Sequence, residues 1–365
     1  MIKPPDYISS LKPYVPRKPI EELERELGIR DSIKLASNEN PVGPSPVALR
    51  AIIESLTSPN PSNSINRYPD GSGYYIKKAL SEKLSVSEDE IILGNGSNEL
   101  IDIATRTFLQ PGDEAVMAHP SFVVYPISVQ ALGGKPVQVS LRHHKHDLEA
   151  MADAVNPKTK ILFIANPNNP TGTINKKDEF DRLMERLPGR ILVVADEAYY
   201  EYVEEPNYAD SMKHFRNGRD ILVLRTFSKI YGLAGLRIGY GIARKEIITE
   251  MNKIRPPFNT SSLAQVAALY ALKDEDHVRY SRKINGEGKR HLYREFDSLG
   301  LKYVPTEANF IYILLGQDSN AIYNALLKQG VIVRPVGPEE IRVTIGLPEE
   351  NKRFIEAIKS VIRKE

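Results

Sequence analysis

Residues 221–240 read ILVLRTFSKIYGLAGLRIGY, and this stretch carries the first indication of both fold and chemistry. The apolar run Ile221–Leu224 predicts a buried strand, and Lys229 follows shortly after it. Open α/β sheets bind ligands at the carboxyl edge of their strands, so a lysine here would lie beside a ligand. An amine in a dry cleft has a lowered pKa and attacks carbonyl groups. Considered alone, an exposed loop lysine explains the pattern more simply.

Strand and helix patterns alternate through most of the chain before this stretch. Several of the strands are apolar throughout, as strands covered on both faces are. This rhythm predicts an α/β fold with a mainly parallel sheet sandwiched by helices. The predicted strands are 90–93, 114–119, 136–139, 160–165 and 190–195, and the predicted helices are 47–56, 74–84, 100–109, 122–132, 148–155 and 176–187.

The pattern changes after Arg244, where longer helices replace the strand–helix alternation. We expect a large domain of residues 44–258 and a smaller α+β domain that combines residues 1–43 with 259–365. The elements expected outside the large sheet are helices at 20–28, 246–254, 262–272, 319–329 and 349–362, a charged helical stretch ending near 299, and strands at 310–314, 331–334 and 341–345.

The composition excludes several classes of function. The 49 basic and 47 acidic residues give a net charge of +2, without the basic stripe typical of nucleic-acid binders. The chain has no cysteine, which excludes disulfides, thiolate metal sites and cysteine nucleophiles. The N-terminus lacks the apolar run of a signal peptide, and no apolar stretch reaches the roughly 20 residues of a membrane span. We therefore expect a cytoplasmic protein.

The run His143-His-Lys-His146 raises the question of a metal site. It has no cysteine and no carboxylate pair at ligand spacing nearby, so a surface turn is the better interpretation. We expect no bound metal.

Polar residues follow three consecutive predicted strands, at the edge where an α/β sheet binds ligands. Asn169 follows the first strand in a segment with two Asn-Pro steps and is itself the residue before the second proline, which restricts its backbone. Asp196 ends the second strand, and Tyr199 lies one turn later. Lys229 follows the third. Each has a simpler explanation as a turn former, helix cap or core residue. Their occurrence together on consecutive strands favours a site.

This set of side chains suits a reaction in which a ring withdraws electrons from a carbanion. The amine would bind the ring compound, a carboxylate would hold its pyridine nitrogen protonated, and a phenol and an amide would bind a ring oxygen. Arg237 and the helix that follows Gly94-Asn-Gly96 could bind a phosphate. That glycine turn is neither a Walker A loop nor the full dinucleotide fingerprint, which argues against a nicotinamide-dependent dehydrogenase.

In these motifs the chain resembles the fold-type I pyridoxal-phosphate aminotransferases, over nearly its whole length. NNPTG at 168–172, DEAY at 196–199 and SK followed by Arg237 are typical of the superfamily in this order. RYPD at 67–70 and the form SKIYGLAGLRIG narrow the resemblance to the histidinol-phosphate branch and its close relatives. Motifs near both ends, LKPY at 11–14 and RVTIG at 342–346, belong to the same resemblance.

The resemblance implies pyridoxal 5'-phosphate as the cofactor and gives residues particular roles. Lys229 would bond to it and then move the substrate's Cα proton, with Asp196 and Tyr199 as the other catalytic residues. Tyr68 would reach the phosphate from a neighbouring subunit, so the resemblance implies a homodimer. The implied cofactor-binding residues are Ser97, Asn98, Ser228 and Arg237 at the phosphate, Phe122 on the ring face, Asn169 and Tyr199 at the ring oxygen, Asp196, Lys229 and Tyr68.

The same resemblance implies that Arg334 and Arg342, helped by Tyr14 and Asn38, bind the anionic end of the substrate. A planar guanidinium suits both the carboxylate of glutamate and the phosphate of histidinol phosphate. The implied reaction converts histidinol phosphate and 2-oxoglutarate to imidazole acetol phosphate and glutamate in histidine biosynthesis. An aromatic amino acid aminotransferase and a threonine-phosphate decarboxylase share this machinery and stay as alternatives.

A non-catalytic regulator that kept the fold is a further alternative of a different class. Such a protein would be expected to have lost Lys229, Asp196 or Arg237, and this chain has all three.

Overall fold

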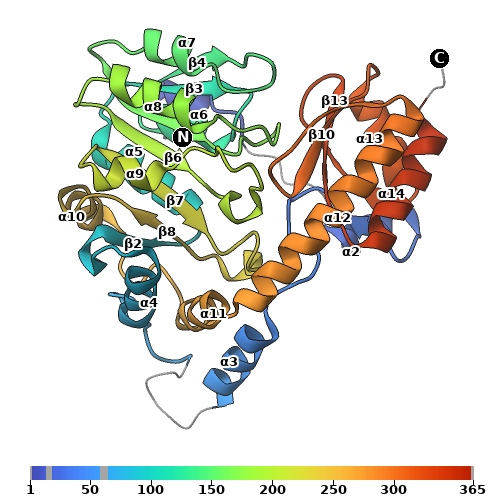
Figure 1. The fold of residues 1–365 in the computed structure, drawn as a ribbon, viewed down its shortest axis with the longest axis horizontal. Coiled ribbons are helices and arrows are strands. Elements are labelled where there is room, and N and C mark those ends of the chain that lie inside the picture. The colour runs from blue at the N-terminus through green and yellow to red at the C-terminus, as the bar shows by residue number, and fades with distance from the viewer. Residues whose placement is uncertain (1, 14–18, 58–64, 363–365) are drawn as a thin grey trace.

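The computed structural model describes residues 2–13, 19–57 and 65–362, and its largest element is a seven-stranded sheet (Figure 1). The strands, in spatial order, are β2 (Ile91–Gly94), β8 (Gly239–Ile242), β7 (Ile221–Thr226), β6 (Leu192–Asp196), β5 (Thr159–Ala165), β3 (Glu114–His119) and β4 (Lys135–Ser140). Neighbouring strands from β7 to β4 are parallel, whereas β8 runs antiparallel to both β2 and β7. The predicted mainly parallel α/β sheet is confirmed.

Helices cover both faces of this sheet, and the strands divide their side chains between two cores. In β5, Leu162 and Ile164 belong to one core and Phe163 to the other, as the alternation of side chains along a strand requires. The helices of the first core include α3 (Pro46–Thr57), α4 (Tyr74–Leu84), α7 (Leu148–Asp153), α8 (Lys177–Arg186), α9 (Ser211–Arg216) and α11 (Ser262–Lys273). Those of the second are α5 (Ser97–Phe108), α6 (Val124–Ala131) and α10 (Lys245–Ile254).

A four-stranded antiparallel sheet forms a second unit beside the large sheet (Figure 1). Its strands are β12 (Arg334–Pro335), β13 (Glu340–Thr344), β10 (Phe310–Leu314) and β9 (Lys302–Val304), in that order. Its core includes residues of α2 (Ile20–Leu27), α12 (Glu275–Leu299), α13 (Ser319–Leu327) and α14 (Pro348–Val361). The N-terminal β1 (Ile33–Lys34) pairs with β11 (Val331–Ile332), so the segment near the start of the chain packs with its last third.

The predicted division between domains at residue 258 stays a prediction. Helix α3 (Pro46–Thr57) and α11 pack together, and Ala264 and Ala268 of α11 are buried in the core of the large sheet. This packing favours a boundary after α11, because its apolar face is shared with the large sheet and not with the four-stranded one.

Several elements differ from the predicted ones. Strand β8 was not predicted, because GYGI reads as part of a glycine-rich loop. Helix α5 begins three residues before the predicted start, since its first turn is polar. The predicted strand 331–334 is two short strands in different sheets. The remaining elements are the short helix α1 (Asp6–Ser9) and 3-10 helices at Glu88–Glu90, Tyr200–Tyr202 and Ala234–Leu236.

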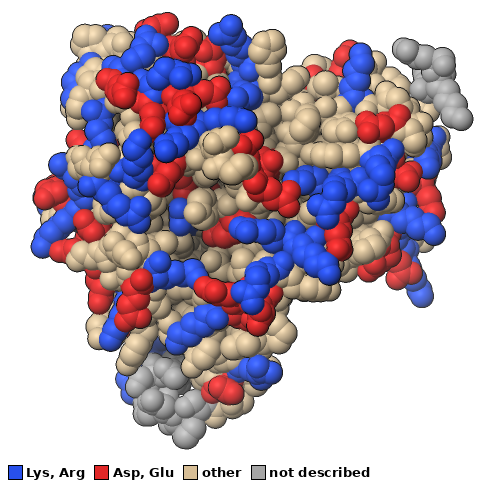
Figure 2. Space-filling view, viewed as in Figure 1, with Lys and Arg blue, Asp and Glu red and all other residues tan. Residues whose placement is uncertain are grey.

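Charges of both signs are mixed over the face of the molecule drawn in Figure 2. Basic and acidic side chains alternate across both sheet units on that face, without an extended region of one sign. Among the described helices, none combines the length and the apolar character that crossing a bilayer requires.

Candidate active site

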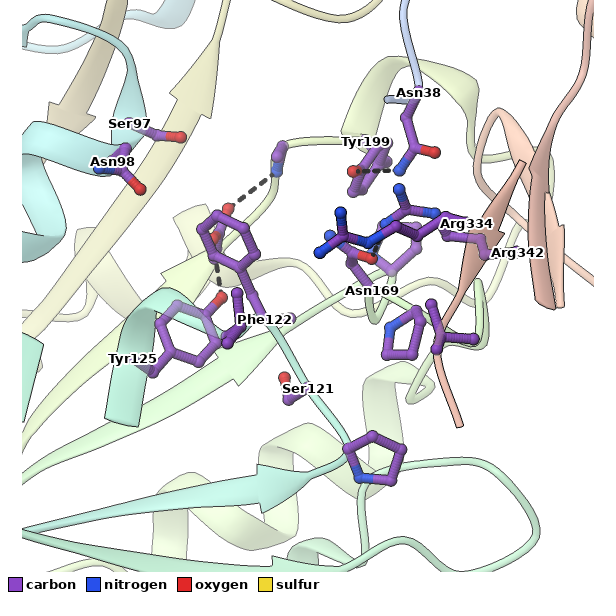
Figure 3. A pocket seen from close by; sticks show the side chains of 18 of the residues that line it. Asn38, Ser97, Asn98, Ser121, Phe122, Tyr125, Asn169, Tyr199, Arg334 and Arg342 are labelled. Atoms are coloured by element: carbon purple, nitrogen blue, oxygen red, sulfur yellow. Dashed lines mark hydrogen bonds between the residues drawn. The ribbon is translucent and has the colours of Figure 1, made fainter. Parts of the chain in front are cut away.

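A cavity of about 680 Å³ lies where the carboxyl edge of the large sheet faces β12 and β13 (Figure 3). Chain segments from both sheet units contribute to its wall, together with the segment that follows β1. Of the residues predicted to form the site, those that line the cavity are Asn38, Ser97, Asn98, Phe122, Asn169, Asp196, Tyr199, Ser228, Lys229, Arg237, Arg334 and Arg342.

The sheet register brings the three polar strand ends together. Ala165 of β5 is aligned with Asp196 of β6, which is aligned with Leu224 of β7. The backbone N–H of Glu197 donates to the Leu224 carbonyl, so the β6 and β7 ends stay paired. Asn169, Asp196 and Lys229 therefore follow neighbouring strands and reach the same edge. The prediction that these three strands are consecutive in the sheet is confirmed.

Lys229 is half-buried and has a lowered pKa. Its Nζ donates to the carbonyl of Ser37 at 3.2 Å and lies 5.5 Å from the centre of the Tyr199 ring. Burial, with a smaller effect of the nearby Arg342 charge, lowers the pKa of this amine to about 7. An appreciable fraction of Lys229 is then uncharged at neutral pH, which is the form that reacts with a carbonyl.

Asp196 is a buried carboxyl group whose two oxygens each accept a hydrogen bond. Oδ2 accepts from the hydroxyl of Tyr125 at 2.7 Å, and Oδ1 accepts from the backbone N–H of Ala198 at 3.2 Å. Burial raises the pKa of Asp196 to about 6, and these two hydrogen bonds oppose the rise. Tyr125 was not predicted as a site residue, since a tyrosine among apolar residues of a helix reads as core. Its spacing of one helical turn from Phe122, which was predicted to contact the cofactor, is the sequence feature that could have indicated a place in the site.

The start of α5 and the residues after β7 form a cradle of hydrogen-bond donors. Ser97 and Asn98 lie in the first turn of α5, where backbone N–H groups have no partner within the helix. Arg237 donates to the hydroxyl of Ser228 at 3.2 Å. Gly96 has a left-handed backbone (φ +75°), and a Cβ atom there would come within 2.5 Å of the Arg237 guanidinium, so a larger residue would be strained and would displace that guanidinium. Such a donor set fits a phosphate group.

Two arginines from the four-stranded sheet lie side by side at the other end of the cavity. Arg334 of β12 is aligned with Arg342 of β13. Arg342 is buried, and it donates to the side-chain oxygen of Asn169 at 2.5 Å and to the carbonyl of Ala36 at 2.6 Å. Figure 3 shows both guanidinium groups beside Asn169. The arrangement can bind an anion next to the strand ends.

Asn38 and Tyr199 form a second contact across the cavity. Asn38 is buried, and its amide donates to the Tyr199 hydroxyl at 2.9 Å (Figure 3). The Asn38 backbone N–H donates to the hydroxyl of Thr344 on β13. The segment after β1 is therefore fixed both to the large sheet and to the four-stranded one.

One described residue among those predicted for the site does not line the cavity. Tyr68 is 80% exposed, and its ring stacks on Phe258 with 4.7 Å between ring centres. Its predicted role at a neighbouring subunit stays a prediction. Tyr14 lies outside the described residues.

The histidine run forms a turn, as predicted, but its last member is buried. His143 and His144 are exposed and have left-handed backbone conformations. His146 is 3% exposed, and its Nε2 lies 3.1 Å from the side-chain oxygen of Asn168. The prediction of a surface turn is thus wrong for His146, because the chain turns inward there to meet the loop after β5.

The chain matches known proteins over almost its whole length. Residues 30–358 match the family model of aminotransferase class I and II. The chain is 51% identical to the histidinol-phosphate aminotransferase of Moorella thermoacetica, over 97% of this chain and 92% of that protein. It is 46% identical to histidinol-phosphate aminotransferase 2 of Pseudomonas aeruginosa, over 97% and 96%.

A solved structure agrees with these sequence relationships. The crystal structure of histidinol-phosphate aminotransferase from Sinorhizobium meliloti in complex with pyridoxal-5'-phosphate has a TM-score of 0.90 to this chain, at 28% identity. The match covers 98% of this chain and 97% of that one. The chain therefore belongs to the class I and II aminotransferase family, among the histidinol-phosphate aminotransferases.

Proposed function

We propose that the protein is a pyridoxal-phosphate-dependent transaminase that converts L-histidinol phosphate and 2-oxoglutarate to imidazole acetol phosphate and L-glutamate, a step of histidine biosynthesis. One observation carries this proposal. A single cavity contains a lysine with a pKa of about 7, a buried carboxylate, a phosphate cradle and a separate pair of arginines. Two anion-binding regions are needed if both the cofactor and the substrate carry a phosphate.

The residues of the cavity fit pyridoxal 5'-phosphate. When bound, this cofactor supplies an electron-withdrawing ring beside the Cα of the substrate. Ser97, Asn98, Ser228 and Arg237 would hold its phosphate. Asp196 would hold a proton on the ring nitrogen, because an ionised carboxylate stabilises a positive charge there. The remaining contacts are those of Phe122 with the ring face and of Asn169 and Tyr199 with the ring oxygen.

Lys229 would act at the reacting carbon, and the arginines would orient the substrate. Lys229 would bind the cofactor covalently and, once released by the substrate amine, move the proton at Cα. Its pKa of about 7 suits this work, since it can both accept and return a proton near neutrality. Arg334 and Arg342 would bind the phosphate of histidinol phosphate or the distal carboxylate of glutamate, which leaves the amino group towards Lys229.

Substrate preference is the direct test of the proposed reaction. We expect kcat/KM for histidinol phosphate to exceed that for phenylalanine by about 100-fold or more, because only the former has a phosphate for the two guanidinium groups. The measurement is steady-state transamination with 2-oxoglutarate as the acceptor. Higher kcat/KM for phenylalanine, or release of carbon dioxide from threonine phosphate, would assign the protein to one of the alternative activities.

We also propose that the protein is a homodimer. Large apolar side chains are exposed on α3 and in the segment that contains Tyr68, where water would otherwise cover them. These exposed residues are Leu49, Ile53, Leu56, Ile65, Tyr74 and Tyr75. A second copy of the chain would bury them and bring Tyr68 to the neighbouring phosphate cradle.

Sedimentation equilibrium tests this assembly. We expect the wild-type protein to sediment as a dimer and Ile53→Asp to shift it towards monomer, since a charge cannot be buried there without a partner. The variant should also lose cofactor affinity if Tyr68 acts across the interface. Glu54→Asp, an exposed neighbour on α3, is the matched control. A fully active wild-type monomer would contradict the proposal.

We place the enzyme in the cytoplasm on the basis of its proposed biosynthetic role. Fractionation of cells that express it would test this, and recovery with the membrane fraction would contradict it.

A further inference from the structure

A tyrosine outside the predicted site makes the shortest side-chain contact with the buried carboxylate. The Tyr125 hydroxyl donates to Asp196 Oδ2 at 2.7 Å, and both side chains are buried (Figure 3). The Tyr125 ring stacks on Phe163 of β5, with 4.7 Å between centres and 10° between planes. It also meets Phe122 edge to face at 5.6 Å. Packing against these two rings fixes the position of the Tyr125 ring and, with it, the direction of the hydroxyl.

The two hydrogen bonds to Asp196 leave part of the carboxylate for a ligand. The Tyr125 hydroxyl donates to Oδ2 and the Ala198 N–H donates to Oδ1, so each oxygen keeps an acceptor position that no hydrogen bond within the described part of the chain occupies. Asp196 also lines the cavity. A carboxylate held at both oxygens cannot rotate freely, and its open positions face a fixed direction.

The charges around Asp196 differ in their effect on its ionisation. Glu197 disfavours the carboxylate form and Lys229 favours it, but burial outweighs both. Glu197 is already paired with Arg225, which donates to it twice from the neighbouring strand. The largest influence that opposes burial is the Tyr125 hydroxyl. Burial beside Asp196 raises the pKa of Tyr125 itself, so it stays a neutral donor at all working pH values.

We propose that Tyr125 is a positioning residue that keeps Asp196 ionised and oriented for the ring nitrogen of the cofactor. A neutral donor suits this task better than a cation would. It stabilises the carboxylate through a hydrogen bond and leaves the negative charge available to the protonated ring. This inference rests on the proposed function, because it assumes that pyridoxal 5'-phosphate occupies the cavity.

The test is the pH dependence of cofactor binding by Tyr125→Phe. The phenylalanine ring preserves the stack on Phe163 and removes only the hydroxyl. Without that donor the protonated form of Asp196 persists to higher pH. Loss of one hydrogen bond to a charged group, at the strength usual for such bonds, should weaken cofactor binding by about ten- to hundredfold at pH 5.5 to 6. By about pH 9 Asp196 is ionised in both proteins, so the ratio of their dissociation constants should fall to the smaller loss that misorientation of the carboxylate alone would cause. Titration of the apoenzyme, followed by cofactor absorbance, gives both constants.

Two further measurements separate this role from a structural one. Tyr323→Phe, which removes a hydroxyl in the core of the four-stranded sheet, should bind the cofactor like wild type at every pH. In an Asp196→Asn background, Tyr125→Phe should cause no further pH-dependent loss, because the ionising group is gone. The comparison of the two backgrounds stays valid if Tyr125→Phe lowers the stability of the fold, because that effect is present in both.

The outcomes are distinguishable. A ratio of dissociation constants that stays the same across pH, or an equal loss in the Asp196→Asn background, would overturn the role of Tyr125. If the wild-type protein fails to bind pyridoxal 5'-phosphate at any pH, the proposed function itself fails.

Discussion

Replacing Lys229 by alanine is expected to lower transamination by on the order of 10⁴-fold while the cavity still binds the cofactor. The amine is the only group in the described cavity wall with both the position and the pKa, about 7, to exchange a proton with the substrate carbon. The phosphate cradle and Asp196 do not depend on it. Single-turnover rates and cofactor titration measure the two effects separately.

Borohydride reduction shows where the covalent bond forms. We expect the wild-type protein to gain the mass of the reduced cofactor on the peptide that contains Lys229, and Lys229→Ala to gain none. Lys273→Ala, an exposed lysine at the end of α11, is the matched control. A label on any other lysine of the wild-type protein would contradict the assignment.

The pH dependence of cofactor capture provides a second check on Lys229. The reacting form is the uncharged amine, and a lowered pKa means that this form appears at lower pH than for an ordinary lysine. The rate constant for capture should therefore rise as the pH increases through about 7 and level off above it. A rate that continued to rise towards pH 10 would show that the amine keeps an ordinary pKa.

The strand ends of the site could be predicted because each is a local pattern with a known place in the fold. An apolar run followed by Asn169, Asp196 or Lys229 gives both a strand and the polar residue at its end. Parallel pairing then brings the three together, as the register of β5, β6 and β7 shows. The chemistry of that edge follows from residue types and order alone.

Contacts between distant segments could not be predicted in the same way. Tyr125 contacts Asp196 across 71 positions, and Arg342 contacts Asn169 across 173. A tyrosine in an apolar helix is usually core, and only the packing shows that its hydroxyl meets a carboxylate. Strand β8 was missed for a related reason, since its pairing with β2 and β7, not its composition, makes it a strand.

Arg342 was predicted from the sequence as a substrate-binding residue, and the structure adds its contact with Asn169. Its replacement should affect both half-reactions. For Arg342→Ala we expect kcat/KM to fall with histidinol phosphate and with glutamate, because a desolvated anion loses its charge partner. The loss corresponds to a rise in activation free energy on the order of 3–5 kcal/mol. Arg334→Ala, on the adjacent strand, is the comparison. The half-reactions are followed separately by cofactor absorbance. A loss confined to one substrate would mean that the two anions do not share this site.

The structure adds a signature that distinguishes substrate binding from simple loss of packing. After burial itself, the charge of Arg342 has the largest lowering effect on the pKa of Lys229. Removing the guanidinium should therefore raise the pKa of Lys229 and move the pH profile of cofactor capture upwards. Arg342→Lys keeps a positive charge but not the planar fork that holds Asn169 and Ala36. Arg342→Lys should retain more of the wild-type pH profile than Arg342→Ala, because the positive charge influences the ionisation of Lys229. It should still lose substrate affinity, because binding of the anion depends on the planar geometry of the guanidinium.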